Sequence, residues 1–137
     1  MKSLFILLAL IPVMAQAQLA DPAVTQANIQ STICIRGYTA TIRPTKFYTG
    51  KVKRQMLRAQ GIPLSKVGRY ELDHIIPLET GGHPSDPRNL QLQLWVGPRN
   101  AHMKDRLEGQ YHRAVCTGKS MLLAAQDYFT STWVIKP

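Results

Sequence analysis

Two short alternating segments, separated by a loop rich in Gly and Pro, constrain the fold of this chain more than any other feature. Residues 68–76 alternate, become β-branched toward their end and stop at Pro77, which predicts a strand ending at Asp73 and His74. Residues 90–94 place Leu at every second position, so they predict a second strand with one buried face. The residues between the two segments are turn formers. We therefore expect a two-stranded antiparallel hairpin with a long loop.

Helical periodicity flanks this hairpin on both sides. Residues 51–60 carry apolar side chains on one face ahead of Gly61, which predicts a helix. A second helix is predicted over residues 101–117, and a third over residues 120–129 with Ser120 as its N-cap. The apolar stripe of the second helix is formed by Met103, Leu107, Tyr111, Ala114 and Val115. The fold class that follows is α+β.

The first residues have the layout of a secretory signal peptide. Residues 1–17 contain a single charge at Lys2, an apolar run over residues 4–13 and small residues up to Ala17. The alternative is a membrane anchor, but the run is shorter than the roughly 20 residues that span a bilayer. We expect cleavage near Ala17 and a periplasmic or secreted protein.

The remainder of the chain is long enough for one compact domain. Residues 18–33 are small and polar and predict a loosely ordered lead-in, and residues 34–137 form the domain itself. Residues 33–43 mix β-branched side chains with a Gly and suit a short extended segment. Trp133 is expected to pack back on the core.

The chain carries a formal net charge of +9, and Lys2 is the only charge in the predicted signal peptide. Such a surface attracts polyanions, nucleic acid above all, in a salt-dependent way. Basic side chains cover much of the helix predicted over residues 51–60. That helix face contacts phosphates in one interpretation and is an ordinary solvated surface in the other.

The chain has two cysteines, Cys34 and Cys116. An even number in an exported chain favours a disulfide, and the long separation excludes a metal knuckle of the CxxC type. Closing a loop of about 80 residues would stabilise the fold by about 4.5 kcal/mol in the chain-entropy model. The alternative is two buried free thiols.

Residues near the end of the first strand have the chemistry needed to hydrolyse a phosphodiester. That reaction needs a base for a water proton and a cation to neutralise phosphoryl charge. Asp73 can supply an oxygen ligand to a hard divalent ion, and His74 can deprotonate water near neutral pH. Asn89 can orient the His74 ring, or simply begin the second strand. Neighbours on a regular strand point to opposite faces, so the pair requires a strand end or bulge.

The order of these parts resembles the HNH endonuclease family of the ββα-metal superfamily. The motif consists of residues 71–78, Gly81 with Gly82, Asn89 with Leu90, and a helix that opens at residues 100–104. Further segments within residues 34–133 are similar to a small exported subgroup of that family: Cys34, residues 37–39, residues 104–108, residues 115–118, and Ala125 with Gln126. The resemblance implies a small ββα-metal core with flanking helices and an endonuclease activity.

The resemblance also implies roles for individual residues. Asp73 would be a metal ligand, His74 the general base and Asn89 the residue that orients it. The third family position falls on Asn100 or His102, with Asn100 preferred because it lies nearest the helix start. The gap from Asn89 is longer than in the common pattern. The implied cofactor is one divalent ion, Mg²⁺ or Mn²⁺ in preference to Zn²⁺ or Ni²⁺, and the zinc-knuckle cysteines of many relatives are absent.

Three cations near the motif are candidates for binding substrate phosphates, or are ordinary surface charges: Arg88, Lys104 and Arg106. Glu71 is interpreted as the partner of a nearby Lys or Arg in preference to a supporting role at the metal. His83 and His112 are interpreted as bystanders.

Three functions remain open at this stage. The first is an exported, metal-dependent, monomeric endonuclease without an obligate protein partner or membrane span, acting on nucleic acid and on DNA in preference to RNA. The second is a non-catalytic basic protein that binds nucleic acid. The third is a metal-independent ribonuclease that uses His74 and His102 as its acid and base.

Overall fold

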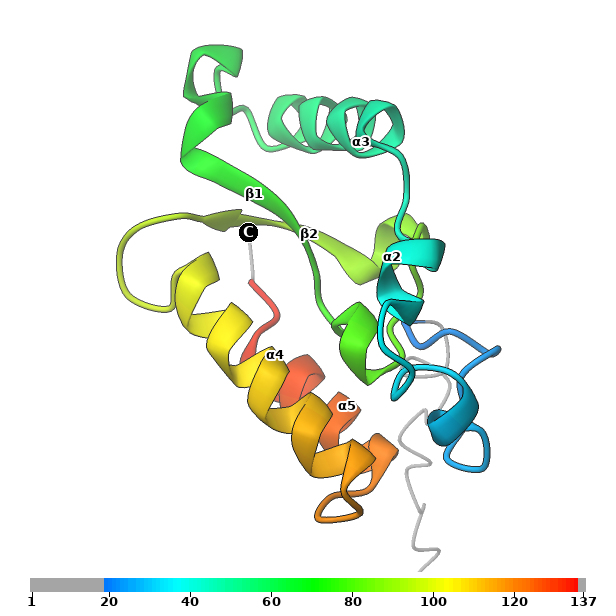
Figure 1. Cartoon of the computed structure of the whole chain (residues 1–137). Helices are drawn as coiled ribbons and strands as arrows, with labels where there is room; N and C mark the ends of the chain where they lie inside the picture. The colour runs from blue at the N-terminus through cyan, green and yellow to red at the C-terminus, as the bar shows by residue number, and fades with distance from the viewer. Residues whose placement is uncertain (1–18, 136–137) are drawn as a thin grey trace, which may run out of the picture.

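The computed structural model describes residues 19–135, so the predicted signal peptide and its cleavage site lie outside the described residues. The elements follow the order of a helical N-terminal part, a hairpin and two C-terminal helices (Figure 1). Within this range no helix is both long and apolar enough to cross a membrane. The mixture of helices with an antiparallel sheet confirms the α+β class.

Both predicted strands are present and pair with each other. Strand β1 (Tyr70–His74) runs antiparallel to β2 (Leu90–Leu94), with Leu72 opposite Leu92 and Asp73 opposite Gln91. The prediction of one buried face on β2 was incomplete, because the strand is buried on both faces except at Leu94. The face that carries the Gln side chains of β2 is covered too.

Helices cover the hairpin on both sides (Figure 1). Helix α3 (Lys46–Ala59) packs on one face, and α4 (Ala101–Cys116) lies with α5 (Leu122–Thr132) on the other. The side chain of Gln91 on β2 reaches the second layer, since its Nε2 donates to the carbonyl of Trp133 at 2.9 Å. Trp133 is buried, as expected.

The helix boundaries differ from the predicted ones where a cap decides them. Helix α3 begins five residues earlier than predicted because Thr45 caps it, accepting a hydrogen bond from Tyr48 N at 3.2 Å. The N-cap of α5 is Met121, without a side-chain cap bond, so the prediction of Ser120 was wrong.

The extended segment predicted over residues 33–43 was also wrong. Its second half forms α2 (Tyr38–Ile42), which follows Gly37 in the left-handed region at φ +87°. The hydroxyl of Thr41 donates back to the carbonyl of Tyr38 at 2.7 Å. One turn held by such local bonds leaves no periodic apolar pattern from which it could be predicted.

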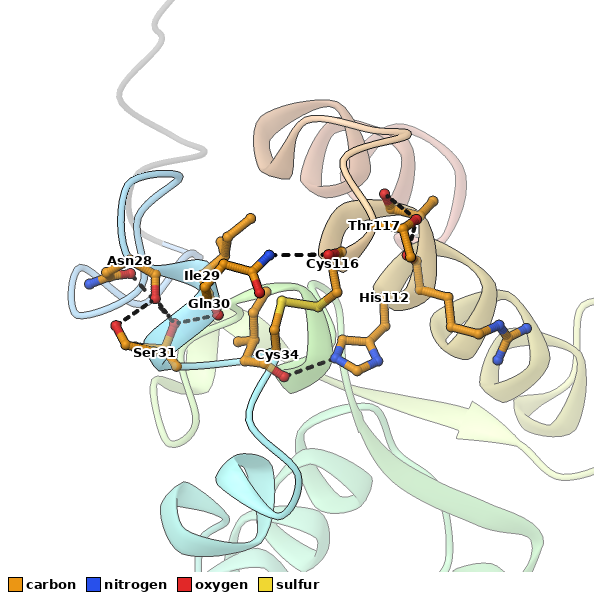
Figure 2. The surroundings of a disulfide bond; sticks show 12 residues. Asn28, Ile29, Gln30, Ser31, Cys34, His112, Cys116 and Thr117 are labelled. Atoms are coloured by element: carbon orange, nitrogen blue, oxygen red, sulfur yellow. Dashed lines mark hydrogen bonds between the residues drawn. A yellow bond between two sulfur atoms is a disulfide. The ribbon is translucent and has the colours of Figure 1, made fainter.

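The lead-in over residues 19–33 is packed into the core and is not loosely ordered. Its three buried apolar side chains cluster with residues of α4 and α5: Val24, Ile29, Ile33, Val115, Leu122 and Ala125. The predicted disulfide joins Cys34 to Cys116, with the two Cα atoms 5.5 Å apart. The bridge therefore ties the lead-in to the end of α4 (Figure 2).

Hydrogen bonds on either side of the bridge hold the same junction. Gln30 Nε2 donates to the carbonyl of Cys116 at 3.1 Å, and His112 Nε2 donates to the carbonyl of Ile33 at 2.9 Å (Figure 2). His112 thus has a structural role, in agreement with its interpretation as a bystander.

Candidate active site at the end of strand β1

The loop between the strands is held together by the fully buried amide of Asn89. Its Oδ1 accepts from Ile76 N at 2.8 Å, and its Nδ2 donates to the carbonyls of Ile76 and His83, each at 3.0 Å. We expected this amide to orient the His74 ring directly. In the described residues it bonds the loop backbone and reaches His74 only through that loop.

The second residue of the Gly81-Gly82 motif must be glycine for a steric reason. A Cβ on Gly82 would lie 1.8 Å from the carbonyl oxygen of Ile76 and 2.8 Å from Asn89 Nδ2. Only glycine permits this close approach of two backbone segments. Helix α3 braces the same loop, because the Tyr48 hydroxyl donates to the carbonyl of Ser85.

The loop in turn fixes the ring of His74, which is buried at the end of β1. His74 Nε2 lies 2.8 Å from the carbonyl oxygen of Pro84. A carbonyl can only accept, so Nε2 carries the hydrogen and Nδ1 of the neutral ring keeps its lone pair. In this tautomer Nδ1 is the nitrogen that can act as a general base.

The surroundings also favour the neutral ring. Burial lowers the pKa of His74, and the charges of Arg43 and Lys104 act in the same direction. The hydrogen bond to Pro84 and the charge of Asp73 oppose the shift but do not cancel it. Because the pKa lies below its ordinary value, the ring can accept a proton near neutral pH.

Lys104 is the largest fully buried side chain of the described residues, with 0% exposure. Its Nζ donates to the carbonyl of His74 at 2.7 Å and to Glu108 Oε1 at 2.6 Å. It also forms an ion pair with Asp73 Oδ2 at 2.8 Å. The prediction that Lys104 contacts substrate phosphates was therefore wrong, because its ammonium group is enclosed by protein.

The stripe of α4 that faces the hairpin explains this burial. Ala101, Lys104 and Val115 are buried, whereas Met103 of the predicted stripe is 39% exposed. The spacing of Lys104 and Glu108 by four residues is the signal that was available, since such a pair lies on one helix face. Because a lysine is rarely buried, its charge led us to expect Lys104 on the protein surface.

Acidic side chains gather next to Asp73 and His74 around a cavity of about 280 Å³, which we call the acid cavity. Its lining consists of Arg43, Glu71, Asp73, His74, Pro77, Leu78, Glu79, Asp105 and Glu108. Asp73 and His74 both border it, although neighbours on a regular strand face opposite ways. The position of His74 at the last residue of β1 resolves that difficulty.

Two glutamates of the acid cavity, Glu71 and Glu108, have raised pKa values. Burial, together with the charges of Asp73, Asp105 and Glu108, raises the pKa of Glu71 to about 7, although the charge of Lys104 opposes the shift. Burial also raises the pKa of Glu108 to about 7 although Lys104 opposes the shift. One lysine therefore does not balance the negative charge of the cavity.

The acid cavity offers carboxylate oxygens, the ligand type of hard divalent cations. Glu71 and Asp73 lie on the same face of β1. The buried Oε2 of Glu71 has no hydrogen-bond partner in the described chain, whereas Asp73 Oδ2 is paired with Lys104 Nζ at 2.8 Å. Such oxygens suit hard cations. No three Asp, Glu, His or Cys side chains within residues 19–135 converge into a ligand set. Mg²⁺ needs only one or two carboxylates, with water and phosphate completing its shell.

Glu71 thus differs from its interpretation as an ordinary ion-pair partner. None of the ion pairs within the described chain includes it. Sequence reasoning passed over it because a Glu next to basic residues most often pairs with one of them. The two-residue spacing to Asp73 was the available signal, since it places both carboxylates on one face.

Asn100 and His102 lie outside the acid cavity. Asn100 is the N-cap of α4 and accepts a hydrogen bond from Met103 N at 3.0 Å. The His102 side chain is 65% exposed, and its Nδ1 lies 4.0 Å from Asp105 Oδ2. The structure brings neither residue to Asp73 and His74, and their assignment to the metal stays a prediction.

The remaining candidates lie on the surface or within the loop. Arg88 is exposed and pairs with Asp86, and Arg106 is exposed on α4. Neither borders the acid cavity. His83 Nδ1 accepts from the backbone N of Asp86 at 3.0 Å, so it supports the loop, in agreement with its interpretation as a bystander.

A second cavity of about 310 Å³ adjoins the first, and we call it the basic groove. It is lined by Arg43, Pro44, Lys46, Thr49, Gly50, Lys53, Glu71, Leu72, His74 and Trp95. Arg43, Glu71 and His74 border both cavities. The His74 ring is therefore adjacent both to the carboxylates and to exposed cations near the start of α3.

No family model, curated protein or solved structure matches this chain.

Proposed function

We propose that the protein is an exported, metal-dependent endonuclease that hydrolyses phosphodiester bonds of nucleic acid, DNA in preference to RNA. The observation that carries the proposal is the state of His74: its Nε2 is committed to Pro84, which leaves the Nδ1 lone pair available, and its side chain borders the same cavity as Asp73 and Glu71, whose Oε2 has no partner in the described chain. In this proposal β1, β2 and α4 form a ββα-metal core, and the exposed cations of the basic groove bind the substrate backbone.

His74 acts as the general base. It accepts a proton from the attacking water at Nδ1, while Pro84 holds the ring through Nε2. The lowered pKa keeps the ring neutral before the reaction, and the nearby Asp73 stabilises the imidazolium formed during it.

Glu71 and Asp73 would hold the divalent ion, which supplies the positive charge that stabilises the phosphoryl oxygens and the leaving oxygen. Lys104 keeps the Asp73 carboxylate in place and ties it to α4. Arg43, Lys46 and Lys53 hold neighbouring phosphates along the basic groove.

Cleavage of plasmid DNA by the purified protein tests the proposal. We expect turnover with added Mg²⁺ or Mn²⁺, none in EDTA, and a loss of at least about 100-fold in the His74→Ala variant with DNA binding unchanged. Undiminished cleavage by His74→Ala protein, freed of host nuclease, would contradict the assignment. Binding without turnover under any metal would favour a non-catalytic protein, and RNA cleavage in EDTA would favour the two-histidine ribonuclease.

A further inference from the structure

Trp95 presents an aromatic surface inside the basic groove. It follows the last residue of β2, and its backbone N donates to the carbonyl of Arg69 at 3.1 Å, which extends the strand pairing by one bond. The side chain is half-buried and lines the groove that His74 also lines. Its position is therefore set by the hairpin.

His102 supports the ring of Trp95. The two ring centroids lie 5.3 Å apart with the planes tilted by 38°. This contact gives His102, which projects from the first turn of α4, a role separate from the metal. A Trp ring that is backed by a second ring and borders an open groove is a ready platform for stacking.

Cations line the same groove as this platform. Arg43 and Lys46 are exposed and Lys53 is half-buried, and all three line the groove together with Trp95. The combination of an aromatic surface with several cations is the chemistry that binds single-stranded nucleic acid, whose bases stack while its phosphates meet the charges. The groove volume of about 310 Å³ is at the low end for binding sites of small molecules, which suits one nucleotide of a strand.

We infer that the basic groove binds single-stranded nucleic acid, with one base stacked on Trp95 and the adjacent phosphate next to His74. In a duplex both faces of an internal base are covered by its neighbours, so Trp95 gains a partner only when the strand is unpaired. Single-stranded nucleic acid would be the substrate class of the proposed nuclease, and this part of the inference rests on the proposed function. The binding itself does not depend on turnover.

The test uses the His74→Ala protein in EDTA, so that binding is measured without cleavage. A fluorescently labelled 12-nucleotide strand and the blunt duplex of the same sequence are compared by anisotropy at one salt concentration. We expect the single strand to bind about tenfold or more tightly than the duplex. Trp95→Ala should remove about tenfold of the single-strand affinity and leave the duplex affinity unchanged, and Trp95→Phe should restore most of it.

Phe47→Ala is the matched control. Phe47 is 81% exposed on α3 but is not among the residues that line the groove. We expect this variant to bind both probes as the parent does. Equal affinity for duplex and single strand, or an equal loss on both probes in Trp95→Ala, would overturn the inference.

A second readout requires no variant. The chain has two tryptophans, and Trp133 is only 3% exposed, so a bound strand can stack on Trp95 alone. Stacking should quench the tryptophan fluorescence on addition of the single strand and not of the duplex. Single-strand binding without quenching would overturn the inference. If binding behaves as expected but the parent protein does not cleave with metal, the proposed nuclease function fails and the binding site stands.

Discussion

The acid cavity and the basic groove share the His74 ring but use lysine in opposite ways. In the acid cavity Lys104 is fully buried, donates to a backbone carbonyl and contacts two carboxylates. In the basic groove Lys46 is exposed and Lys53 half-buried, and neither forms an ion pair with another described residue. The comparison shows one lysine committed to the fold and two available to a ligand.

This difference follows from the cost of burying charge. Removing a buried ion from water costs several kcal/mol, so Lys104 is tolerated only because its partners satisfy it. Exposed cations cost little and interact weakly with the fold, but they release counterions when they bind phosphate. Stability should therefore depend on the acid cavity, and affinity for nucleic acid on the basic groove.

The largest expected effect is the loss of stability in Lys104→Met. The change leaves Asp73 and Glu108 buried without their counterion, so we expect the free energy of unfolding to fall by about 3–5 kcal/mol. Urea denaturation of the purified variant measures it. Lys53→Met is the matched control and should stay within about 0.5 kcal/mol of the parent. Similar losses in both variants would remove the distinction between the two regions.

A smaller effect is expected at Glu71, in a pH-dependent way. Its folded-state pKa of about 7 lies above the ordinary glutamate value of 4.5, so the folded state binds the proton more tightly than the unfolded state. That contribution to stability is present below pH 4.5 and is lost as the pH rises through about 7. Glu71→Gln removes this loss of stability, because the amide cannot ionise. With allowance for its partial exposure, we expect the variant to match the parent near pH 4 and to gain about 1–2 kcal/mol at pH 8.

Thermal unfolding of both proteins between pH 4 and pH 8 in EDTA checks this prediction. A constant difference between Glu71→Gln and the parent across the pH range would show that Glu71 does not carry the excess charge of the acid cavity.

Added Mg²⁺ should raise the melting temperature of the parent at pH 8 more than that of Glu71→Gln, because the oxygen that we assign to the metal is lost.

The smallest expected effect concerns the basic groove. If Lys53 contacts one phosphate, Lys53→Met should weaken binding and reduce the slope of log affinity against log salt by about 0.7 to 0.9. Titrations at several salt concentrations measure it. Lys119→Met is the control, because this lysine lies beyond α4 and outside the groove. An unchanged slope in Lys53→Met would contradict the assignment of Lys53 to a phosphate contact in the groove.

The hairpin could be predicted because its signals are local. Alternation in β2 and the breakers between the strands specify strand and loop without reference to the rest of the chain. The position of Asp73 and His74 at the end of the first strand could be predicted for the same reason, and their catalytic role stays a prediction.

The parts that escaped prediction depend on packing between distant elements. Lys104 is buried only because α4 lies against the end of β1, and no local pattern marks a lysine as interior. Asn89 bonds to Ile76 and His83 across a loop whose path is not encoded in the spacing of residues. The lead-in is packed because the disulfide and the side chains of α4 and α5 enclose it.

The central claim is that chemistry depends on His74 and substrate binding on the basic groove. Measuring the maximal cleavage rate and the Kd of His74→Ala and Lys53→Met with Mg²⁺ and one oligonucleotide tests it most directly. We predict that His74→Ala lowers the rate at least about 100-fold with an unchanged Kd, and that Lys53→Met raises the Kd with an unchanged rate. A His74→Ala protein that cleaves at the parent rate would contradict the account.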